Sequence, residues 1–351
     1  MRVAAFTKYG REAASTRQRL LQYLPSLAAA GIEVDYSPLL GDDYVRSLAS
    51  GGSFSKLAVA RSYARRLKQL LRGTDCDVLW VYAELFPYWP AWFERLAFRT
   101  GKPVVYDFDD AFFLTYDGNR LLAGKLDPLI AGAAACCCGN DYLRDYALRL
   151  NPRSIVLPTV VDTDVYVPAQ RAADRPVTIG WIGSPSTWQY VRPLLPLLEE
   201  LCDGERARML VVGAGSAATG DRFSGMEFVQ WSEAGEVASV QAMDIGIMPL
   251  PDEPWARGKS GYKLIQYMAC GLALVASPVG VNSTIVRDGE TGLLASSAEE
   301  WRARLEALIA DRGMRERMGA AGRQRAVEAY SLQSQARRLI EVFREPSARG
   351  A

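Results

Sequence analysis

The most informative stretch of the sequence is EPWARGKSGYKLIQYMACGLALVASPVGVNSTIVRDGETGLLA (253–295). An apolar strand over 244–250 runs into a proline-bounded loop and a Gly-Lys-Ser-Gly turn. The residues after this turn predict a helix over 262–269, which Gly271 ends as a C-terminal cap. A further apolar strand, LALVAS (272–277), follows at once. This order of strand, helix and strand is typical of a parallel sheet that is covered by helices.

The same alternation extends along the whole chain. Apolar runs predict strands in the second half at 177–183, 208–215, 226–231 and 291–295, and in the first half at 2–7, 32–38, 77–83, 103–108, 135–138 and 154–158. Between the strands of the first half, helical patterns cover 16–30, 54–72, 87–100, 119–132 and 140–149. We therefore expect an α/β protein with two doubly wound, Rossmann-like domains that face each other across a cleft.

A polar, proline-flanked stretch separates the two series of strands. This stretch, VVDTDVYVPAQRAADRP (160–176), is the best candidate for an interdomain linker. It divides the chain into a first domain over 1–165 and a second over 166–330. The remaining segment, 331–351, contains a helix from about Ser331 to Arg344 with no strand after it, and such a helix could pack back onto the first domain.

Composition excludes several kinds of chemistry. The 351 residues contain no histidine, so imidazole bases, His-ligated zinc and Ser-His-Asp catalysis are absent. A net charge of +1 gives no field that would favour nucleic acid. The run Cys136, Cys137 and Cys138 predicts a buried strand in a reducing compartment. The N-terminus becomes polar after one short strand, unlike a signal peptide, so we expect a cytoplasmic protein.

The turn and helix start within 258–266 have the chemistry of an anion site. Free amides in the first helical turn and the helix dipole favour a phosphate, and glycines allow close approach of the backbone. Gln266 lies one turn deeper, where it could bond a sugar hydroxyl. A solvated basic helix start explains the same spacing. The residues that would form the site are Arg257, Gly258, Lys259, Ser260, Gly261, Tyr262, Lys263 and Gln266.

This region resembles the C-terminal signature of family 4 glycosyltransferases, which are retaining enzymes of the GT-B architecture. YMACGLALVASPVG (267–280) and DGETGLL (288–294) match closely. Most members carry two glutamates eight positions apart, where this sequence has Gly258 and Gln266. The sequence instead matches a branch with the form Gly-Lys-x-Gly-x-Lys-x-x-Gln-Tyr-Met-Ala. The resemblance implies a nucleotide-diphospho-sugar donor, with UDP or GDP expected, and neither a metal nor another cofactor.

The resemblance also implies donor contacts elsewhere in the second domain. The loop after strand 177–182 is similar to the family's glycine loop for the diphosphate, which makes Gly183 and Ser184 candidates. Independently, Ser184 could cap the next helix with Pro185 at its first position. Trp231 matches a position beside the nucleotide base, although it could also be a half-buried aromatic. The usual lysine after the glycine loop is missing, so Lys259 and Lys263 would neutralise the diphosphate.

Charged residues of the first domain are candidates for acceptor binding and catalysis. Arg17 and Arg19 lie at a helix start, where cations oppose the helix dipole unless an anion binds there, although a solvated helix face explains them equally. Asp107, Asp109 and Asp110 lie at the end of a buried strand. Burying and crowding three carboxylates costs free energy, which favours either a functional site or hydrogen-bonded structural caps. We expect Asp109 or Asp110 to assist as acid or base, and acceptor contacts from Arg17, Arg19, Glu84 and Asp107. An Asp-x-Asp metal site is disfavoured by the two-domain layout.

The resemblance therefore implies transfer of a sugar, with retention, to a glycan, a glycolipid or a small-molecule acceptor. A catalytically weak partner subunit and a nucleotide-sugar epimerase remain alternatives, because the glutamates and the histidine usual in the family are missing. VVGAGSAATG (211–220) matches a dinucleotide fingerprint but lacks the long helix after it, which disfavours an oxidoreductase. A lipid-borne acceptor would require peripheral membrane contact, for which RSYARRLKQLLRG (61–73) is the suitable segment.

Overall fold

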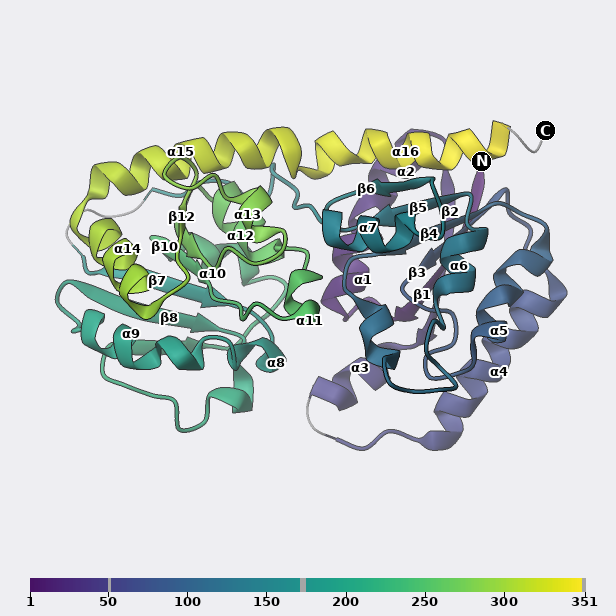
Figure 1. The fold of residues 1–351 in the computed structure, drawn as a ribbon, viewed down its shortest axis with the longest axis horizontal. Coiled ribbons are helices and arrows are strands. Elements are labelled where there is room, and N and C mark those ends of the chain that lie inside the picture. The colour runs from purple at the N-terminus through teal and green to yellow at the C-terminus, as the bar shows by residue number, and fades with distance from the viewer. Residues whose placement is uncertain (50–51, 171–174, 349–351) are drawn as a thin grey trace. The chain divides into compact units, whose positions relative to one another are not determined.

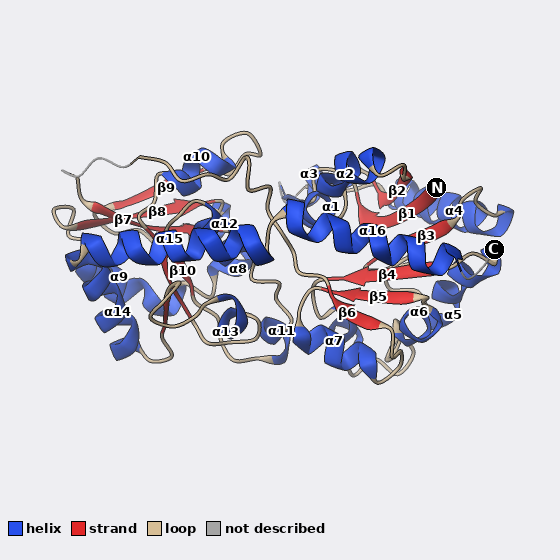
Figure 2. Cartoon of the chain, turned by 90° about the horizontal axis from the view of Figure 1, so that it is seen from above, coloured by secondary structure: helices blue, strands red, loops and turns tan. Residues whose placement is uncertain are grey.

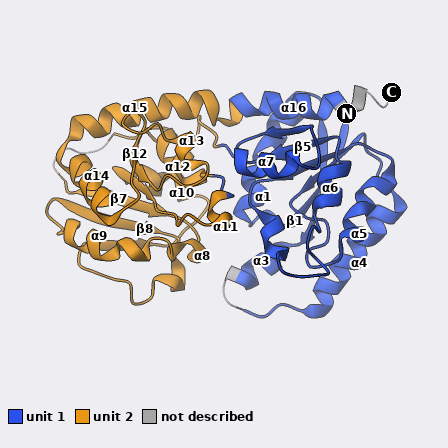
Figure 3. Cartoon of the chain, in the orientation of Figure 1, with its two compact units in different colours: residues 1–160, 258–260, 334–351 blue, residues 161–257, 261–333 orange. Residues whose placement is uncertain are grey.

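The computed structural model describes residues 1–49, 52–170 and 175–348, which form two compact units (Figures 1 and 3). Unit 1 comprises Met1–Val160, Gly258–Ser260 and Ser334–Ala351, and unit 2 comprises Val161–Arg257 and Gly261–Gln333. The first division falls five residues before the expected boundary at 165. Most of the expected linker is therefore part of unit 2, while its residues 171–174 lie outside the described ranges.

Unit 1 is built on a parallel sheet of six strands (Figure 2). The strand order is β2-β1-β3-β4-β5-β6, so the chain reverses direction across the sheet between β1 and β3. Open α/β sheets bind ligands at the carboxyl ends of their strands, at this kind of reversal. The strands are β1 (Arg2–Tyr9), β2 (Glu33–Leu40), β3 (Val78–Tyr82), β4 (Val104–Phe108), β5 (Ala135–Cys138) and β6 (Ser154–Val156).

The helices of unit 1 follow the predicted pattern with local differences. The helix expected over 16–30 is broken after Leu20, and α2 starts anew with Pro25 in its first turn. The helix expected from 119 begins only at Asp127, where Pro128 again occupies the first turn. The helices are α1 (Ala14–Arg19), η1 (Leu21–Tyr23), α2 (Leu24–Ala29), α3 (Asp42–Ala49), α4 (Lys56–Arg72), α5 (Ala91–Glu94), η2 (Arg95–Thr100), η3 (Phe112–Tyr116), α6 (Asp127–Gly132) and α7 (Asp141–Leu148).

The chain's last helix, α16 (Leu332–Ala348), returns to unit 1 as expected (Figure 1). Phe343 is fully buried, and its ring centroid lies 5.1 Å from that of Trp80 in β3. The guanidinium of Arg338 donates to the carbonyl of Val156 at 2.9 Å. The core of unit 1 therefore includes residues from both ends of the sequence.

Unit 2 repeats the design with a second parallel sheet, in the order β12-β11-β10-β7-β8-β9. The reversal lies between β7 and β10. The strands are β7 (Val177–Ile182), β8 (Ala207–Val212), β9 (Met226–Val229), β10 (Ile245–Met248), β11 (Ala273–Ala276) and β12 (Leu293–Leu294). The helices are α8 (Pro185–Trp188), η4 (Arg192–Leu194), α9 (Leu195–Leu201), η5 (Gly215–Ala218), α10 (Glu236–Gln241), α11 (Pro254–Arg257), α12 (Tyr262–Ala269), α13 (Asn282–Ile285), α14 (Ala298–Ala310) and α15 (Arg312–Ala329).

The segment after β8 and the cysteine run have the local structure that the sequence predicts. Only the short η5 follows β8, so the fingerprint at 211–220 lacks its long helix, as the sequence indicates. All six cysteines are buried and free of disulfides, including the run in β5.

Across the described ranges, none of the helices is both long and apolar enough to cross a lipid bilayer.

Candidate functional site

The carboxyl edge of the unit 2 sheet brings together two predicted donor residues, Gly183 and Lys263. Gly183 follows β7, and a Cβ atom placed on it would lie only 2.7 Å from Cε of Lys263 in α12. The lysine stem therefore rests on the glycine backbone, and its Nζ lies 5.6 Å from the ring centroid of Trp181. Gly213, which follows β8 with φ +83°, packs directly against the Gly183 carbonyl. Larger residues would separate these loops.

The loop after Gly183 differs in detail from the prediction. Ser184 is the N-cap residue of α8 and Pro185 is the first helical residue, as expected. The Ser184 hydroxyl does not cap the helix, however, because it lies 3.0 Å from the Ser186 hydroxyl instead. The backbone amides at this short helix start are therefore not capped by the serine side chain.

A hollow of about 470 Å³ opens next to these loops. It is lined by the loop 213–220, by Arg222 and by the end of β9 with Trp231. The sequence 211–220 gives no signal that it forms the wall of a pocket against Trp231, because that requires the pairing of β8 with β9.

The carboxylate of Glu236, at the start of α10, joins the predicted residues Trp231 and Gln266. Trp231 Nε1 donates to Glu236 Oε2 at 2.5 Å, and Gln266 Nε2 donates to Oε1 at 2.8 Å. The hydroxyl of Tyr166 also donates to Oε1, and it lies 3.5 Å from the Tyr262 hydroxyl. Burial, reinforced by Tyr262 and Glu236, raises the pKa of Tyr166, so this hydroxyl stays a neutral donor.

Sequence reasoning missed both Glu236 and Tyr166. Tyr166 lies in the expected linker, yet it is part of unit 2 and only 8% of its surface is exposed. Glu236 is the first residue of α10 and follows the polar stretch 232–235, where a lone glutamate carries no periodic or motif signal. Their position beside Gln266 depends on three segments that are far apart in sequence.

The predicted helix start at Gly261 is present, but its cations are not all available to one ligand. Gly261 has φ +69° and precedes α12, and Gln266 is only 2% exposed. Arg257 makes a two-point ion pair with Asp252, at 2.7 and 3.1 Å. Lys263 is therefore the basic residue that the structure brings to the Gly183 loop.

The segment Gly258–Ser260 belongs to unit 1, where it joins two predicted catalytic residues. Lys259 Nζ lies 3.1 Å from Asp110 Oδ1. Asn140 Nδ2 donates to the carbonyls of Gly258 and Lys259, at 3.1 and 2.9 Å. A Cβ on Gly258 would collide with Ala111, so the glycine permits this approach. Lys259 and Asp110 thus act as a partly exposed ion pair.

The predicted acceptor residues Arg19 and Asp107 form a buried ion pair instead. Arg19 Nη2 and Nε lie 2.6 and 3.1 Å from Asp107 Oδ1, and Trp80 Nε1 donates to Oδ2 at 3.2 Å. Both side chains are fully buried. Burial raises the pKa of Asp107, against the lowering effect of Arg19. The expectation of acceptor contact does not fit this pair, because each charge is already satisfied away from solvent.

Asp109 and Arg17 occupy different surroundings. Asp109 is 6% exposed and accepts a hydrogen bond of 2.6 Å from Tyr82. Burial, together with Asp109, raises the pKa of this tyrosine. Arg17 is half-buried and donates to the carbonyls of Arg11 and Glu12. Of the two predicted acid–base residues, Asp110 is therefore more exposed to solvent than Asp109.

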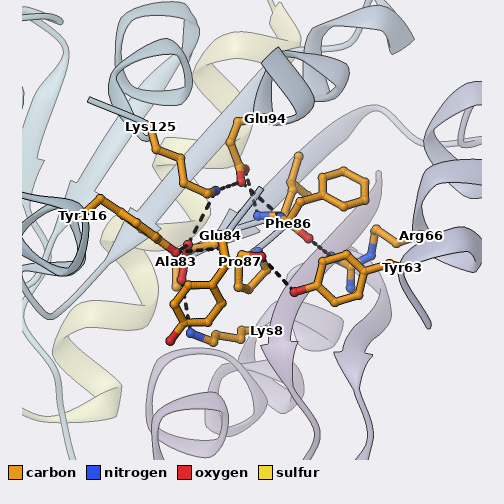
Figure 4. A network of polar contacts seen from close by, with 12 residues as sticks. Lys8, Tyr63, Arg66, Ala83, Glu84, Phe86, Pro87, Glu94, Tyr116 and Lys125 are labelled. Carbon is orange, nitrogen blue, oxygen red and sulfur yellow. Dashed lines mark hydrogen bonds and ion pairs between the residues drawn. The ribbon is translucent and has the colours of Figure 1, made fainter. Parts of the chain in front are cut away.

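Glu84 lies at the reversal between β1 and β3, in a network of buried charges (Figure 4). It follows Ala83, which has a left-handed φ of +64°. Its carboxylate lies 3.2 Å from Lys8 Nζ and 3.5 Å from Lys125 Nζ, and it accepts a hydrogen bond from Tyr116. Lys125 also pairs with Glu94, so two lysines and two glutamates balance in charge.

Lys8 is the more exposed end of this network. Its side chain is 17% exposed, against 2% for Glu84. Its Nζ lies 5.7 Å from the ring centroid of Tyr88, which is 66% exposed and has φ +61°. Burial opposes the charge, but Glu84 and the tyrosines outweigh it and raise the pKa of Lys8. Glu84 thus orients Lys8, a residue that sequence reasoning missed.

The acidic residues at the strand ends are each held by protein partners. Asp107 is held by Arg19, Asp109 by Tyr82 and Asp110 by Lys259. Within the ranges that the structure describes, no group of three histidine, cysteine, aspartate or glutamate side chains is placed to hold a metal ion.

The amino-acid sequence is similar to a known protein family and to several known enzymes. Residues 176–311, most of unit 2, match the family model of Glycosyl transferases group 1. The chain is 29% identical over 245 residues to alpha-maltose-1-phosphate synthase of Mycolicibacterium smegmatis, covering 60% of this chain and 61% of that protein. It is 25% identical to phosphatidyl-myo-inositol mannosyltransferase of Mycobacterium leprae, covering 86% and 82%. The chain therefore spans less than two thirds of the first of these relatives.

Solved structures show the same fold along the whole chain. Sucrose-phosphate synthase from Thermosynechococcus elongatus superposes with a TM-score of 0.76 at 14% identity, covering 99% of both chains. HepE of Anabaena, in complex with UDP-glucose, gives 0.74 at 13% identity, covering 97% of this chain and 98% of that one. These solved structures show that the chain has the GT-B fold. Largely within its second unit, residues 176–311 are similar to the Glycosyl transferases group 1 model.

Proposed function

We propose that this protein is a retaining glycosyltransferase that uses a nucleotide-diphospho-sugar. The observation that carries the proposal is the packing of Lys263 on Gly183 at the reversal of the unit 2 sheet, beside the hollow at Trp231. A cation over a glycine loop suits a diphosphate, and an aromatic-lined hollow suits a nucleotide base. The resemblance of the chain to a structure solved with UDP-glucose supports the same donor class.

In the proposed reaction, the bond from the anomeric carbon to the diphosphate breaks and a bond to the acceptor oxygen forms on the same face. The proton of the acceptor hydroxyl passes to the departing phosphate oxygen, so no protein nucleophile is required. Lys263 and the amides at the start of α12 stabilise the negative charge that develops on the diphosphate. We propose that the reaction needs no bound metal, since Lys263 supplies the positive charge.

Unit 1 provides the groups that we propose for the acceptor. Asp110, paired with Lys259, is a partly exposed carboxylate that could orient the attacking hydroxyl. Lys8, held by Glu84 beside the exposed ring of Tyr88, could contact a sugar or a phosphate on the acceptor. One relative is named for a phosphatidylinositol acceptor. A glycolipid acceptor, with membrane contact through α4, is therefore part of the proposal.

Donor binding is tested by thermal stabilisation against UDP-, GDP-, ADP- and TDP-sugars and the free nucleotides. A ligand that binds only the folded state raises the melting temperature, by about 2.7 kcal/mol of stability at a hundred times its Kd. We expect one base to give a clear shift that survives EDTA. Lys263→Ala should weaken the binding of that donor about 10- to 100-fold, because a charge-assisted contact to the diphosphate is lost.

Lys102→Ala, at an exposed lysine of unit 1, is the matched control and should bind the donor normally. A flat response of the wild-type protein to every nucleotide would contradict the proposal. Donor binding without transfer to any acceptor would instead favour a partner-subunit role. Dependence of binding on a divalent cation would contradict the metal-free part alone.

A further inference from the structure

The carboxylate of Glu236 is an unusual feature of the unit 2 edge, because its described partners are all neutral. They are the Tyr166 hydroxyl, the Gln266 amide and the Trp231 indole N–H. A carboxylate can accept about four hydrogen bonds, and these three donors leave room for about one more, on Oε2. Glu236 is also only partly buried, so an unfilled acceptor position can face a ligand.

The negative charge restricts what that ligand can be. A phosphate beside Glu236 would be repelled, so the diphosphate must lie at Lys263 and Gly183 rather than here. Hydroxyl groups, in contrast, donate to a carboxylate and form short, charge-assisted hydrogen bonds. One such donor fills the acceptor position that Glu236 has left. Trp231, whose indole bonds the same carboxylate, also lines the hollow that we propose for the base.

We propose that Glu236 binds the 2′-hydroxyl of the donor's ribose, an inference that rests on the proposed nucleotide-sugar donor. Gln266 is then a positioning residue rather than a ligand contact. It is 2% exposed, and its Nε2 is used by Glu236 at 2.8 Å and by Tyr166 at 3.2 Å. Tyr166 and Gln266 both bond Oε1, which fixes the carboxylate and leaves Oε2 with a single donor, Trp231.

The proposal makes Glu236 the residue that selects ribonucleotides. A site that is built to bond a hydroxyl rejects the analogue that lacks it, because a buried acceptor is left unpaired. We therefore expect 2′-deoxyribonucleoside diphosphates to bind more weakly than the matching ribonucleoside diphosphates. TDP-sugars, which contain deoxyribose, should be poor donors for the same reason.

The test measures the Kd of a matched pair by titration calorimetry: UDP against 2′-deoxy-UDP, and GDP against 2′-deoxy-GDP. For the base that binds, wild type should prefer the ribose form about 10- to 100-fold. Glu236→Gln should weaken the ribose form by a similar factor, leave the deoxy form within about threefold, and bring the ratio near one. Glu199→Gln, an exposed glutamate of α9, is the control and should keep the wild-type ratio.

Three results would overturn the inference. Equal losses of the ribose and deoxy forms in Glu236→Gln would make Glu236 a purely structural residue. An unchanged ribose preference would place the 2′-hydroxyl contact elsewhere, while the proposed donor class would stand. If wild type binds neither pair and none of the nucleotides and nucleotide sugars above shifts its melting temperature, the proposed function itself fails. Glu236→Asp, which keeps the charge on a shorter stem, provides a second variant should Glu236→Gln unfold. It should reduce the ribose preference without affecting the deoxy form.

Discussion

At the scale of single residues, the two arginines of the first helix have opposite roles. Arg19 is buried and paired with Asp107, and its Nη1 donates to the Leu157 carbonyl at 2.7 Å. Arg17, two positions earlier, is half-buried and donates to the nearby backbone carbonyls of Arg11 and Glu12. Removing one member of a buried ion pair leaves the other charge uncompensated, which is costly. Arg19 therefore supports the fold of unit 1.

We predict that Arg19→Ala lowers the free energy of unfolding by about 3–5 kcal/mol, because Asp107 would remain buried without its partner. Arg17→Ala should lower it by less than about 1 kcal/mol. Denaturant unfolding of the two variants, side by side with wild type, checks the difference. Similar small effects of both substitutions would show that the buried pair adds little to stability.

At the scale of elements, α4 separates its charges between two faces. Arg66 points inward, where it bonds the carbonyls of Thr7 and Ser37 at 3.1 and 2.7 Å, and burial lowers its pKa to about 9. The helix contains no acidic residue. Its exposed surface carries Lys56, Leu57, Arg61, Arg65, Lys68, Leu71 and Arg72. A basic helix face with exposed leucines is suited to binding an anionic membrane surface.

We predict that the protein binds vesicles containing phosphatidylserine more strongly than neutral phosphatidylcholine vesicles, and less so at high salt. Basic residues near such a surface contribute about 1 kcal/mol each. The double variant Arg61→Glu with Arg65→Glu should therefore lose at least about tenfold in vesicle affinity, measured by co-sedimentation. Arg206→Glu with Arg317→Glu, at exposed positions of unit 2, is the matched control. Equal binding to both kinds of vesicle would argue against this role of α4.

At the scale of the whole molecule, the chain completes unit 1 only at its end. It leaves unit 1 at Val160, forms unit 2 and re-enters unit 1 at Ser334. Leu339 and Phe343 of α16 are fully buried there, and Phe343 packs on Trp80. The stability of the first unit therefore depends on residues that lie more than 170 positions after its last strand.

We predict that Phe343→Ala destabilises unit 1 by about 3–5 kcal/mol, since it removes a buried aromatic ring and leaves a cavity. For a unit of this size, each kcal/mol lowers the melting temperature by about 2–4 °C. Calorimetry of the full chain measures this shift. Val327→Ala, at an exposed position of α15, should leave the melting temperature nearly unchanged. A negligible shift for Phe343→Ala would mean that α16 is not needed for the core of unit 1.

The sequence by itself determined the parallel sheets, because continuous apolar strands that alternate with helices have few other ways to bury their surfaces. It also indicated Gly183, Trp231, Lys263 and Gln266, since strand ends, glycines and helix starts are local signals. Their roles in binding remain predictions.

Only the tertiary structure decided which charged groups are satisfied internally and which meet a ligand. Arg19 and Asp107 are 88 positions apart in sequence, and nothing local reveals that they pair in the core. Glu236, Gln266 and Tyr166 likewise come from three separate segments that the second sheet brings to one edge. Pairing of this kind depends on the register of the strands and on side-chain packing, which composition and periodicity do not encode.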